Sequence, residues 1–496
     1  MAKKTINKEL TGAQDLYNFL FEACNIIRGP VSQDNFKDYI TPLLYYKRIS
    51  DVYDEETEEA LISSGGDKEY ASLPEQHRFV IPDGCHWQEV RERTENLGAA
   101  IVGAMRQIEI ANPDTLYGVL SMFSSQKWTN KAILNDSKIR DLIEHLSKRK
   151  LGNKDYPADL MGDAYEILLK KFADDSKAQA GEFYTPRSVV RLLVHILDPQ
   201  PGETVYDPAC GSGGMLIEAI RYMHDDSLCC GSIFGQEKNV VNAAIAKMNL
   251  FLHGASDFNV MQGDTLRDPK ILQGGNIAKF DCVIANPPFS LENWGATEWS
   301  SDKYKRNIYG TPSDSCGDYA WIQHMICSMV SGQGRMAVVM PQGILFRNQE
   351  TEIRKQLVES DLIEAVVTLG DKLFYGTGLS PCFLIIRRMK QAHHSGRILM
   401  IDGSKILTQK RAQNILEEND IDRLYSLYQN YSDEEDYSRI VTLQEIRDKE
   451  YNLSPNRYVV YHKEEIRPYA EVLAEFKQAY ADVKRLENEF SLLINA

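Results

Sequence analysis

Apolar residues in the first third of the chain recur at intervals of three and four positions. Such residues share one face of a helix, so the pattern predicts a helical domain over residues 1–160. The positions that carry this pattern are Leu16, Phe19, Leu20, Ala23 and Ile27, followed later by Leu142 and Leu146. Because this part of the sequence contains no catalytic motif, we interpret it as a packing or docking domain.

Between residues 161 and 410 the pattern changes to short apolar runs that alternate with helical segments. The runs are 204–206, 232–235, 281–285, 335–340, 363–369, 382–387 and 398–401. Strands separated by helices predict an α/β domain built on a parallel sheet. Ligands of such sheets bind at the carboxyl ends of the strands, so the residues directly after each run are the candidates for function.

The remaining segment, 411–496, is expected to be helical and charged, and its end carries a sharper pattern. Apolar residues alternate there in steps of three and four, which is typical of a heptad seam. They are Tyr469, Val472, Phe476, Ala479, Val483, Leu486, Phe490 and Leu493. Over so few heptads two interpretations stay open: a helix packed on its own domain, or a helix that docks on a partner.

A glycine-rich turn directly after the run 204–206 is the first candidate site. It reads Asp207-Pro208-Ala209-Cys210-Gly211-Ser212-Gly213-Gly214 and precedes a helical run. Glycines allow a tight turn and a close approach of the backbone to a ligand, and the helix that follows offers free N–H groups. Taken alone, the turn is weak evidence, since a purely structural turn looks the same. It is not a Walker loop, because the chain has no Gly-Lys-Ser or Gly-Lys-Thr sequence.

Two acidic residues follow the next strands of the predicted sheet. Glu237 ends the run that begins near residue 232, and its carboxylate could accept hydrogen bonds from both hydroxyls of a ribose. Asp264, in Gly263-Asp264-Thr265, follows a third strand and could accept a hydrogen bond from an adenine amino group. A helix cap or a solvated side chain would also explain Glu237, and an Asx turn or a helix N-cap would also explain Asp264.

The motif Asn286-Pro287-Pro288-Phe289 at the end of the run 281–285 is far more specific. Two consecutive prolines hold the backbone in a rigid extended path. The Asn286 side-chain oxygen and the Pro287 carbonyl then form two neighbouring acceptors for the two N–H groups of an exocyclic amine. Such an amine is a poor nucleophile, and two acceptors would localise charge on its nitrogen and aim it at an electrophile. Phe289 offers a flat surface on which a base can stack.

In this order, the motifs resemble those of amino-group DNA methyltransferases, in particular the modification subunits of type I restriction-modification systems. Further segments are similar to that family, and the resemblance covers most of the chain. These segments are 181–187, 334–341, 375–381 and 452–458. The resemblance implies a Rossmann-like methyltransferase sheet that uses S-adenosylmethionine, with a helical N-terminal domain and a helical C-terminal extension.

The resemblance also implies a role for each matching residue. Asp207 and the segment Gly211, Ser212, Gly213 and Gly214 are expected to hold the amino-acid portion of S-adenosylmethionine, Glu237 its ribose and Asp264 its adenine. Asn286, Pro287, Pro288 and Phe289 are expected to bind the target base. The methionine end of the cofactor is expected to lie against Glu182, Phe183, Tyr184, Thr185, Pro186 and Arg187. No metal site is expected.

The charge of the chain bears on how it reaches DNA. With a net charge of −15, the chain lacks the basic excess that proteins gripping DNA unaided usually carry. The sequence also shows no ATP-binding loop, nuclease motif or target-recognition domain. The resemblance implies that double-stranded DNA is read by a separate specificity subunit bound by two modification subunits, together with a motor-nuclease restriction subunit. We expect the terminal heptad helix to dock on the specificity subunit.

Other properties of the sequence limit where the protein works. No apolar stretch approaches the ~20 residues that a membrane span needs. The N-terminus lacks the apolar core of a secretory signal, and the nine cysteines are scattered, so we expect a cytoplasmic protein.

Several alternatives stay open at this point. The Asn-Pro-Pro motif would serve cytosine N4, an RNA guanine or a protein glutamine as well, and a non-catalytic cofactor-binding scaffold is a further reading. The long polar segment 290–318, which contains Lys303, Lys305 and Arg306, is expected to be either a lid that orders around DNA or a flexible insertion.

Overall fold

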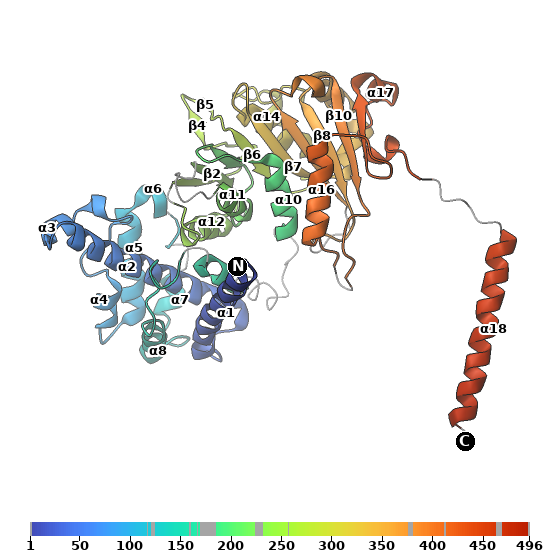
Figure 1. Cartoon of the computed structure of the whole chain (residues 1–496). Coiled ribbons are helices and arrows are strands. Elements are labelled where there is room, and N and C mark those ends of the chain that lie inside the picture. Colours follow the sequence, from blue (N-terminus) through green and yellow to red (C-terminus); the bar gives the residue numbers. More distant parts are fainter. Residues whose placement is uncertain are drawn as a thin grey trace.

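The computed structural model describes residues 2–116, 118–120, 125–157, 160–165, 167–168, 185–223, 232–255, 257–374, 380–410, 413–462 and 469–494. These residues form a helical N-terminal part, a central part built on a nine-stranded sheet, and a long terminal helix (Figure 1). The predicted fold class is thereby confirmed. Among the described helices, none is both long and apolar enough to cross a membrane.

The N-terminal part is held together by the apolar faces that the sequence predicts, since Leu16, Leu20 and Leu142 are fully buried in one core. The same core takes in Phe251 from the central part and continues past residue 160 to Leu168. Its helices are α1 (Ala2–Ile27), α2 (Lys37–Ser63), α3 (Lys68–Ala71), α4 (Trp87–Arg91), α5 (Leu97–Ala111), α6 (Pro113–Leu116), α7 (Ser125–Thr129) and α8 (Asp136–Leu146), with the short 3-10 helices η1 (Gln33–Asn35) and η2 (Pro74–Gln76).

The central sheet has the strand order β11-β10-β8-β9-β7-β6-β1-β2-β3. Its pairs are parallel except at β9, which is antiparallel to both β7 and β8, and at β11, which is antiparallel to β10. The strands are β1 (Val205–Asp207), β2 (Ile233–Glu237), β3 (Phe258–Gln262), β6 (Cys282–Ala285), β7 (Arg335–Pro341), β8 (Ile363–Leu369), β9 (Pro381–Arg387), β10 (Arg397–Gly403) and β11 (Ser438–Thr442). A separate hairpin joins β4 (Leu272–Gln273) to β5 (Asn276–Ile277).

Both faces of this sheet are covered, which explains the continuous apolar runs in the sequence. Successive side chains of a strand point to opposite faces. On β6, Cys282 and Ile284 therefore join one core, whereas Val283 and Ala285 join the other. All four residues of this strand are buried. A reactive polar side chain can therefore first occur directly after β6, at Asn286.

Helices from across the central part supply the two layers. The first layer contains α10 (Arg187–Leu197), α11 (Gly214–Met223), α12 (Val240–Leu252) and α16 (Glu418–Asn430), whose apolar residues lie in the same core as Ile284. The second contains α14 (Asp318–Ser328), α15 (Thr351–Glu359) and α17 (Leu443–Asp448). The remaining short elements are α13 (Ala296–Ser300), η3 (Gln342–Leu345), η4 (Asn348–Glu350), η5 (Ala392–His394) and η6 (Pro455–Arg457).

The structure differs from the sequence-based prediction beyond residue 410. We expected only helices there, but β11 extends the sheet by one strand. Buried and exposed positions do not alternate along β11: only two of its residues are buried, and Ile440 is half-buried. A strand with so few apolar residues leaves no clear period in the sequence. The segment is a strand because it pairs with β10.

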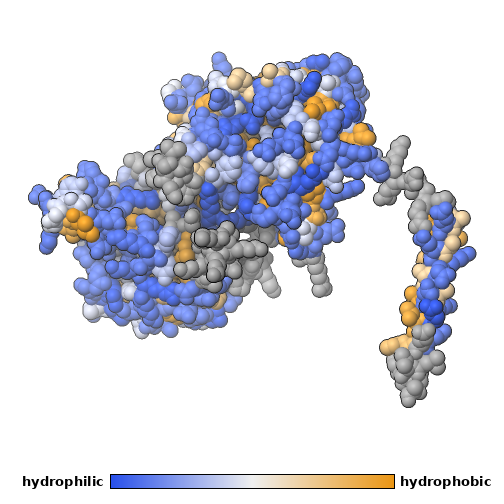
Figure 2. Space-filling view, in the orientation of Figure 1, coloured by the Kyte–Doolittle hydropathy of each residue, from blue (hydrophilic) through white to orange (hydrophobic). Residues whose placement is uncertain are grey.

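The terminal helix α18 (Tyr469–Ile494) carries the predicted heptad seam on its surface. Phe476, for example, is 66% exposed and Phe490 is 64% exposed. Apolar side chains accordingly gather along this helix in Figure 2. Of the two interpretations left open by the sequence, packing against its own domain is therefore wrong for the described residues.

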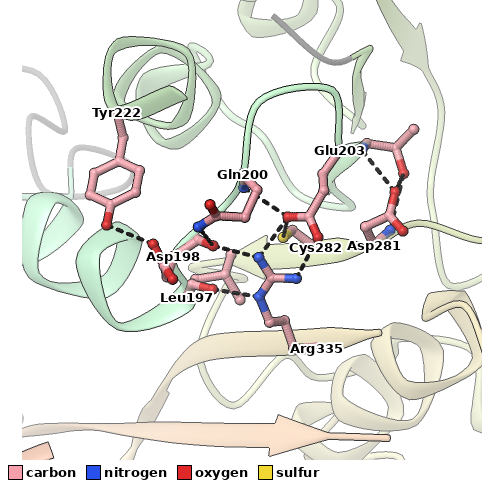
Figure 3. A network of polar contacts seen from close by, with 9 residues as sticks. Leu197, Asp198, Gln200, Glu203, Tyr222, Asp281, Cys282 and Arg335 are labelled. Atoms are coloured by element: carbon pink, nitrogen blue, oxygen red, sulfur yellow. Dashed lines mark hydrogen bonds and ion pairs between the residues drawn. The ribbon is translucent and has the colours of Figure 1, made fainter. Parts of the chain in front are cut away.

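A buried arginine at the start of β7 fixes the far end of α10 (Figure 3). Arg335 donates from Nε to the carbonyl of Leu197 at 2.6 Å, and from its two terminal nitrogens to the carboxylate of Glu203 at 2.9 and 2.6 Å. Burial would raise the pKa of Glu203, but the hydrogen bonds from Arg335 and the Gln200 amide outweigh it and hold that pKa below its usual value. The network ties α10 to the amino-terminal edge of the sheet.

We predict that Arg335→Met lowers the free energy of unfolding of the central part by about 3 kcal/mol, because Glu203 loses its buried cationic partner. Denaturant unfolding followed by tryptophan fluorescence measures this change. Arg397→Met is the matched control, since Arg397 lies exposed at the start of β10. The control should change stability by less than about 0.5 kcal/mol. Equal effects of the two substitutions would contradict the role of the network.

Candidate active site

The predicted site residues follow neighbouring strands and meet at one edge of the sheet. Asp207 ends β1, Glu237 ends β2 and Asn286 follows β6. Strand β1 lies between β2 and β6 and is parallel to both, so the carboxyl ends of all three point the same way. Residues far apart in the sequence are thereby collected at the position where ligands of α/β sheets bind.

The glycine-rich turn between β1 and α11 has the backbone conformation that its sequence predicts. Gly211 and Gly213 have φ values of 53° and 85°, in the left-handed region that favours glycine. The Ser212 carbonyl accepts a hydrogen bond from the Asn249 amide of α12 at 2.7 Å. Gly214 begins α11. The turn is thus a defined, tightly held structure at the amino end of a helix.

Glu237 lies against this turn. One of its carboxylate oxygens accepts the Gly211 N–H at 3.0 Å, and the other accepts the Asn239 N–H at 2.7 Å. A carboxylate has about four lone-pair positions, so acceptor capacity remains for an outside donor. The side chain is held in place and can still bind hydroxyl groups.

Asp207 is buried at the centre of the site. Its carboxylate accepts the Ala209 N–H at 2.9 Å. Desolvation raises the pKa of Asp207 to about 8; the Ala209 hydrogen bond opposes this shift, and the nearby carboxylate of Glu237 adds to it. Part of the Asp207 population is therefore protonated at neutral pH, and a cation placed beside it would favour the charged form.

Asp264 is more heavily engaged than the sequence indicates. It forms an ion pair with Lys238 at 2.9 Å, and its other oxygen accepts the Arg267 N–H at 3.2 Å. It therefore caps the turn that follows β3, as the structural alternative proposed. Lys238 is largely exposed, so this ion pair stabilises little.

Asn286 combines one satisfied and one unsatisfied group. Its Nδ2 donates a hydrogen bond to Thr185 Oγ1 at 2.8 Å. Its Oδ1 is buried and has no hydrogen-bond partner among the described residues. An unpaired buried acceptor is costly in a folded protein, and this one lies directly after β6, where ligands of α/β sheets bind, so it is available to an outside donor.

Two aromatic rings lie beside this acceptor segment. Phe289 is half-buried, and its ring centroid lies 6.4 Å from that of Phe374, at an interplanar angle of 53°. Phe374 comes shortly after β8, so the rule that singled out the other site residues applies to it too. Phe374 does not directly follow the apolar run 363–369, because residues 370–373 lie between them, so its position was not predicted from the sequence.

The segment between β6 and α14 corrects the expectation of a DNA-ordered lid or a free insertion. Trp294 and Trp299 are buried, and so is the charged residue Arg306. Arg306 pairs with Asp302 at 2.7 Å and donates to the carbonyls of Thr265 and Leu266. Its guanidinium also stacks over the Trp299 ring at 4.5 Å. The segment is a packed part of the domain.

The same segment is fastened directly behind the base motif. The Ser290 N–H donates to the buried carboxylate of Asp318 at 2.7 Å, and Arg347 pairs with the other oxygen of that carboxylate. Lys303 and Lys305 remain exposed. A charged residue between aromatic residues looks the same in the sequence whether it is buried or exposed, so the burial of Arg306 could not be predicted.

The family-like segment before the site is only partly described. Glu182, Phe183 and Tyr184 lie outside the described residues, as do residues 375–379. Pro186 is the N-cap residue of α10. The Arg187 guanidinium forms ion pairs with two carboxylates, at 3.6 Å from Nη2 to Asp163 Oδ1 and at 3.8 Å from Nε to Glu218 Oε2. Arg187 also lines a cavity of about 550 Å³ between α10 and the start of α16.

Known protein families match both the helical N-terminal part and the central part of the chain. The sequence profile of the family described as N-6 DNA Methylase matches residues 156–466, and that of the HsdM N-terminal domain matches residues 16–146. The chain is 34% identical over 471 residues to the type I restriction enzyme MjaVII methylase subunit of Methanocaldococcus jannaschii, which covers 90% of this chain and 78% of that protein.

Two further relatives extend the similarity. The chain is 31% identical to the type I restriction enzyme HindI methylase subunit of Haemophilus influenzae, over 76% of this chain and 84% of that protein. The crystal structure of a type I restriction-modification system methyltransferase subunit from Streptococcus thermophilus superimposes with a TM-score of 0.76 at 26% identity. That alignment covers 91% of this chain and 100% of the other.

Proposed function

The chain belongs to the N-6 DNA methylase family, as the methylase subunit of a type I restriction-modification system, and on this premise we propose that Asn286 holds the adenine it methylates. The observation that carries this proposal is the buried Oδ1 of Asn286, which has no partner among the described residues. An adenine N6 amine supplies the donor that this oxygen lacks. The Pro287 carbonyl is the second acceptor.

The residues around the glycine-rich turn fit S-adenosylmethionine, the cofactor that this family implies. Asp207 provides a buried carboxylate that a cationic ligand would keep charged, and Glu237 has spare acceptor capacity beside the turn. We propose that Asp207 and the turn Gly211–Gly214 hold the amino-acid portion, that Glu237 holds the ribose, and that Asp264 contacts the adenine. The segment 182–187 is proposed to lie against the methionine end.

The reaction then depends on alignment more than on acid–base chemistry. S-adenosylmethionine supplies a methyl group that is already activated on a sulfonium. The chain's own residues orient the adenine amine by accepting from it, and neutral acceptors localise its lone pair toward the methyl carbon. No basic side chain is required before attack, and the proton leaves afterwards through Asn286 or water.

Phe289 and Phe374 are proposed to bracket the target base. Adenine cannot reach the site inside a duplex, so it must leave the stack, which costs a few kcal/mol. Contacts of the extruded base with two aromatic rings offset part of that cost. The rings are tilted by 53°, with centroids 6.4 Å apart, and we propose that Phe289 is the stacking surface and Phe374 an edge contact.

We predict that Asn286→Ala lowers methyl transfer by about 100-fold or more, because it removes an acceptor used as charge develops. The measurement is incorporation of labelled methyl groups into DNA, with and without the co-expressed partner subunits, followed by identification of the modified nucleoside. Glu237→Ala is the matched comparison. It should weaken cofactor binding in calorimetry, whereas Asn286→Ala should leave that binding nearly unchanged.

Either of two results would count against this proposal. One is near wild-type turnover by the Asn286→Ala variant, which would remove Asn286 from the chemistry. The other is a product other than N6-methyladenine, such as a base methylated at cytosine N4, an RNA product or a protein product.

A second prediction follows from the raised pKa of Asp207. Binding of a cationic ligand requires the charged carboxylate, so affinity for S-adenosylmethionine should fall as the pH drops below about 8. For one linked proton the fall is roughly tenfold per pH unit. Calorimetric titrations between pH 7.5 and 6.0 measure the slope. Asp207→Asn is the control, because it has no proton to lose. Identical slopes for the two proteins would refute the linkage.

Assembly with partners is the remaining part of the proposal. We propose that a separate specificity subunit reads the DNA sequence, that two copies of this chain bind it, and that a motor-nuclease subunit joins the complex. The net charge of −15 supports a division in which a partner supplies much of the DNA affinity. The exposed seam of α18 supports docking of this helix on the specificity subunit.

Deletion of residues 465–496 should accordingly abolish co-purification with the specificity subunit and leave cofactor binding intact. A single substitution tests the seam itself: Phe476→Glu places a charge on the seam, whereas the matched control Gln478→Glu places one on the opposite face of the helix. We expect loss of the complex with the first substitution and retention with the second, measured by size-exclusion chromatography. Retention of the complex after the deletion would disprove docking through α18.

A further inference from the structure

Thr185 lies beside Asn286, just before the amino end of α10. It precedes Pro186, the N-cap of α10, whose φ of −55° leaves the backbone little freedom. The opposite end of α10 is clamped by Arg335 at the start of β7 (Figure 3). An α-helix of 11 residues is about 16 Å long. The helix therefore runs from Thr185, which lies beside Asn286, to the end held by Arg335.

The contact with Thr185 involves the nitrogen of the Asn286 amide and not its oxygen. Nδ2 donates to Thr185 Oγ1 at 2.8 Å, and Oδ1, on the other branch of the amide, is the atom without a partner. An amide turned by 180° would present two N–H donors in place of the oxygen. Those donors would meet the N–H donors of an adenine amine, and no hydrogen bond would form.

We propose that Thr185 is a positioning residue that keeps the oxygen of Asn286 turned toward the target amine. This inference rests on the proposed role of Asn286 in base binding. The Thr185 hydroxyl accepts from Nδ2 with a lone pair and keeps its own proton for another acceptor. Once the hydroxyl proton is engaged by that other acceptor, Oγ1 has only lone pairs to offer, and the Asn286 amide has one favourable orientation.

The test separates the hydroxyl from the shape of the side chain. Thr185→Val keeps the branched shape and removes the hydrogen bond, Thr185→Ser keeps the hydroxyl, and Thr185→Ala is a second variant that removes it without adding a methyl. The control is Thr368→Val, because Thr368 lies on β8 and bonds to Ile401 and Asp402, away from the carboxyl ends of β1 and β6. Single-turnover rates are measured on the full chain in complex with its specificity subunit.

The rates are read at saturating cofactor and DNA, so that any change in cofactor affinity drops out. We expect the rate with Thr185→Val and Thr185→Ala to fall about tenfold, in line with one lost hydrogen bond. Thr185→Ser should recover most of the rate, and the control should match wild type. Added to Asn286→Ala, the Thr185→Val substitution should cause no further loss, since both changes act on one amide.

Other outcomes overturn the proposal. A wild-type rate for Thr185→Val at saturating cofactor would mean that the hydroxyl serves the cofactor alone or nothing. Equal losses with valine and serine would make the role steric. A further loss on the Asn286→Ala background would mean that Thr185 acts independently. If Asn286→Ala itself keeps wild-type turnover, the proposed base site fails and this inference with it, whereas failure of Thr185→Val alone leaves that site standing.

Discussion

The burial of the central sheet on both faces is the constraint on which the rest of the molecule depends. All four residues of β6 are buried, with alternate side chains in two different cores. A polar group inside such a strand would have to be fully hydrogen-bonded, so reactive groups are confined to the strand ends. Asn286 is the first residue past this limit, and Pro287 and Phe289 continue the chain away from the sheet along a rigid path.

The site contains two buried polar groups whose burial is unfavourable in the absence of a ligand. Asp207 is a buried carboxylate beside the carboxylate of Glu237, an arrangement that desolvation and like charge both disfavour. Asn286 Oδ1 is a buried acceptor with no partner among the described residues. On the roles proposed for these two residues, a cationic cofactor would relieve the first cost and an amine donor the second. Local conflicts of this kind are expected at functional sites, where stability is given up for binding.

The sequence predicts those parts of the molecule that depend on local pattern. The run 363–369 coincides with β8, and the residues after the strands Val205–Asp207 and Cys282–Ala285 do lie at one edge. Contacts between distant residues leave no such pattern. The hydrogen bond from Asn286 to Thr185 joins positions 101 residues apart, and β11 is a strand because β10 lies next to it.

The burial of the charged residue Arg306 is another feature that the sequence pattern does not predict. Its neighbours Lys303 and Lys305 are exposed, whereas the Arg306 side chain points inward and donates hydrogen bonds to Asp302 and to two backbone carbonyls. Nothing in the sequence separates it from the two lysines. The energetic reason is geometric: a guanidinium can satisfy several acceptors at once, so it tolerates a burial that an ammonium rarely does. Packing of the segment 290–318 thus depended on a fit visible only in three dimensions.

The choice of an amide at position 286 follows from the charge of its surroundings. A carboxylate there would also accept from an amine, but it would lie near the ends of β1 and β2, which already carry Asp207 and Glu237. A third carboxylate would itself become protonated and donate where it should accept, and it would repel the phosphates of DNA. A neutral amide keeps its acceptor at every pH. The cost of that choice is that an amide can face either way, whereas the two oxygens of a carboxylate are equivalent. A neighbouring hydroxyl that accepts from Nδ2 and gives its own proton to another acceptor removes the ambiguity, and this is the role that we propose for Thr185 at the tip of β6.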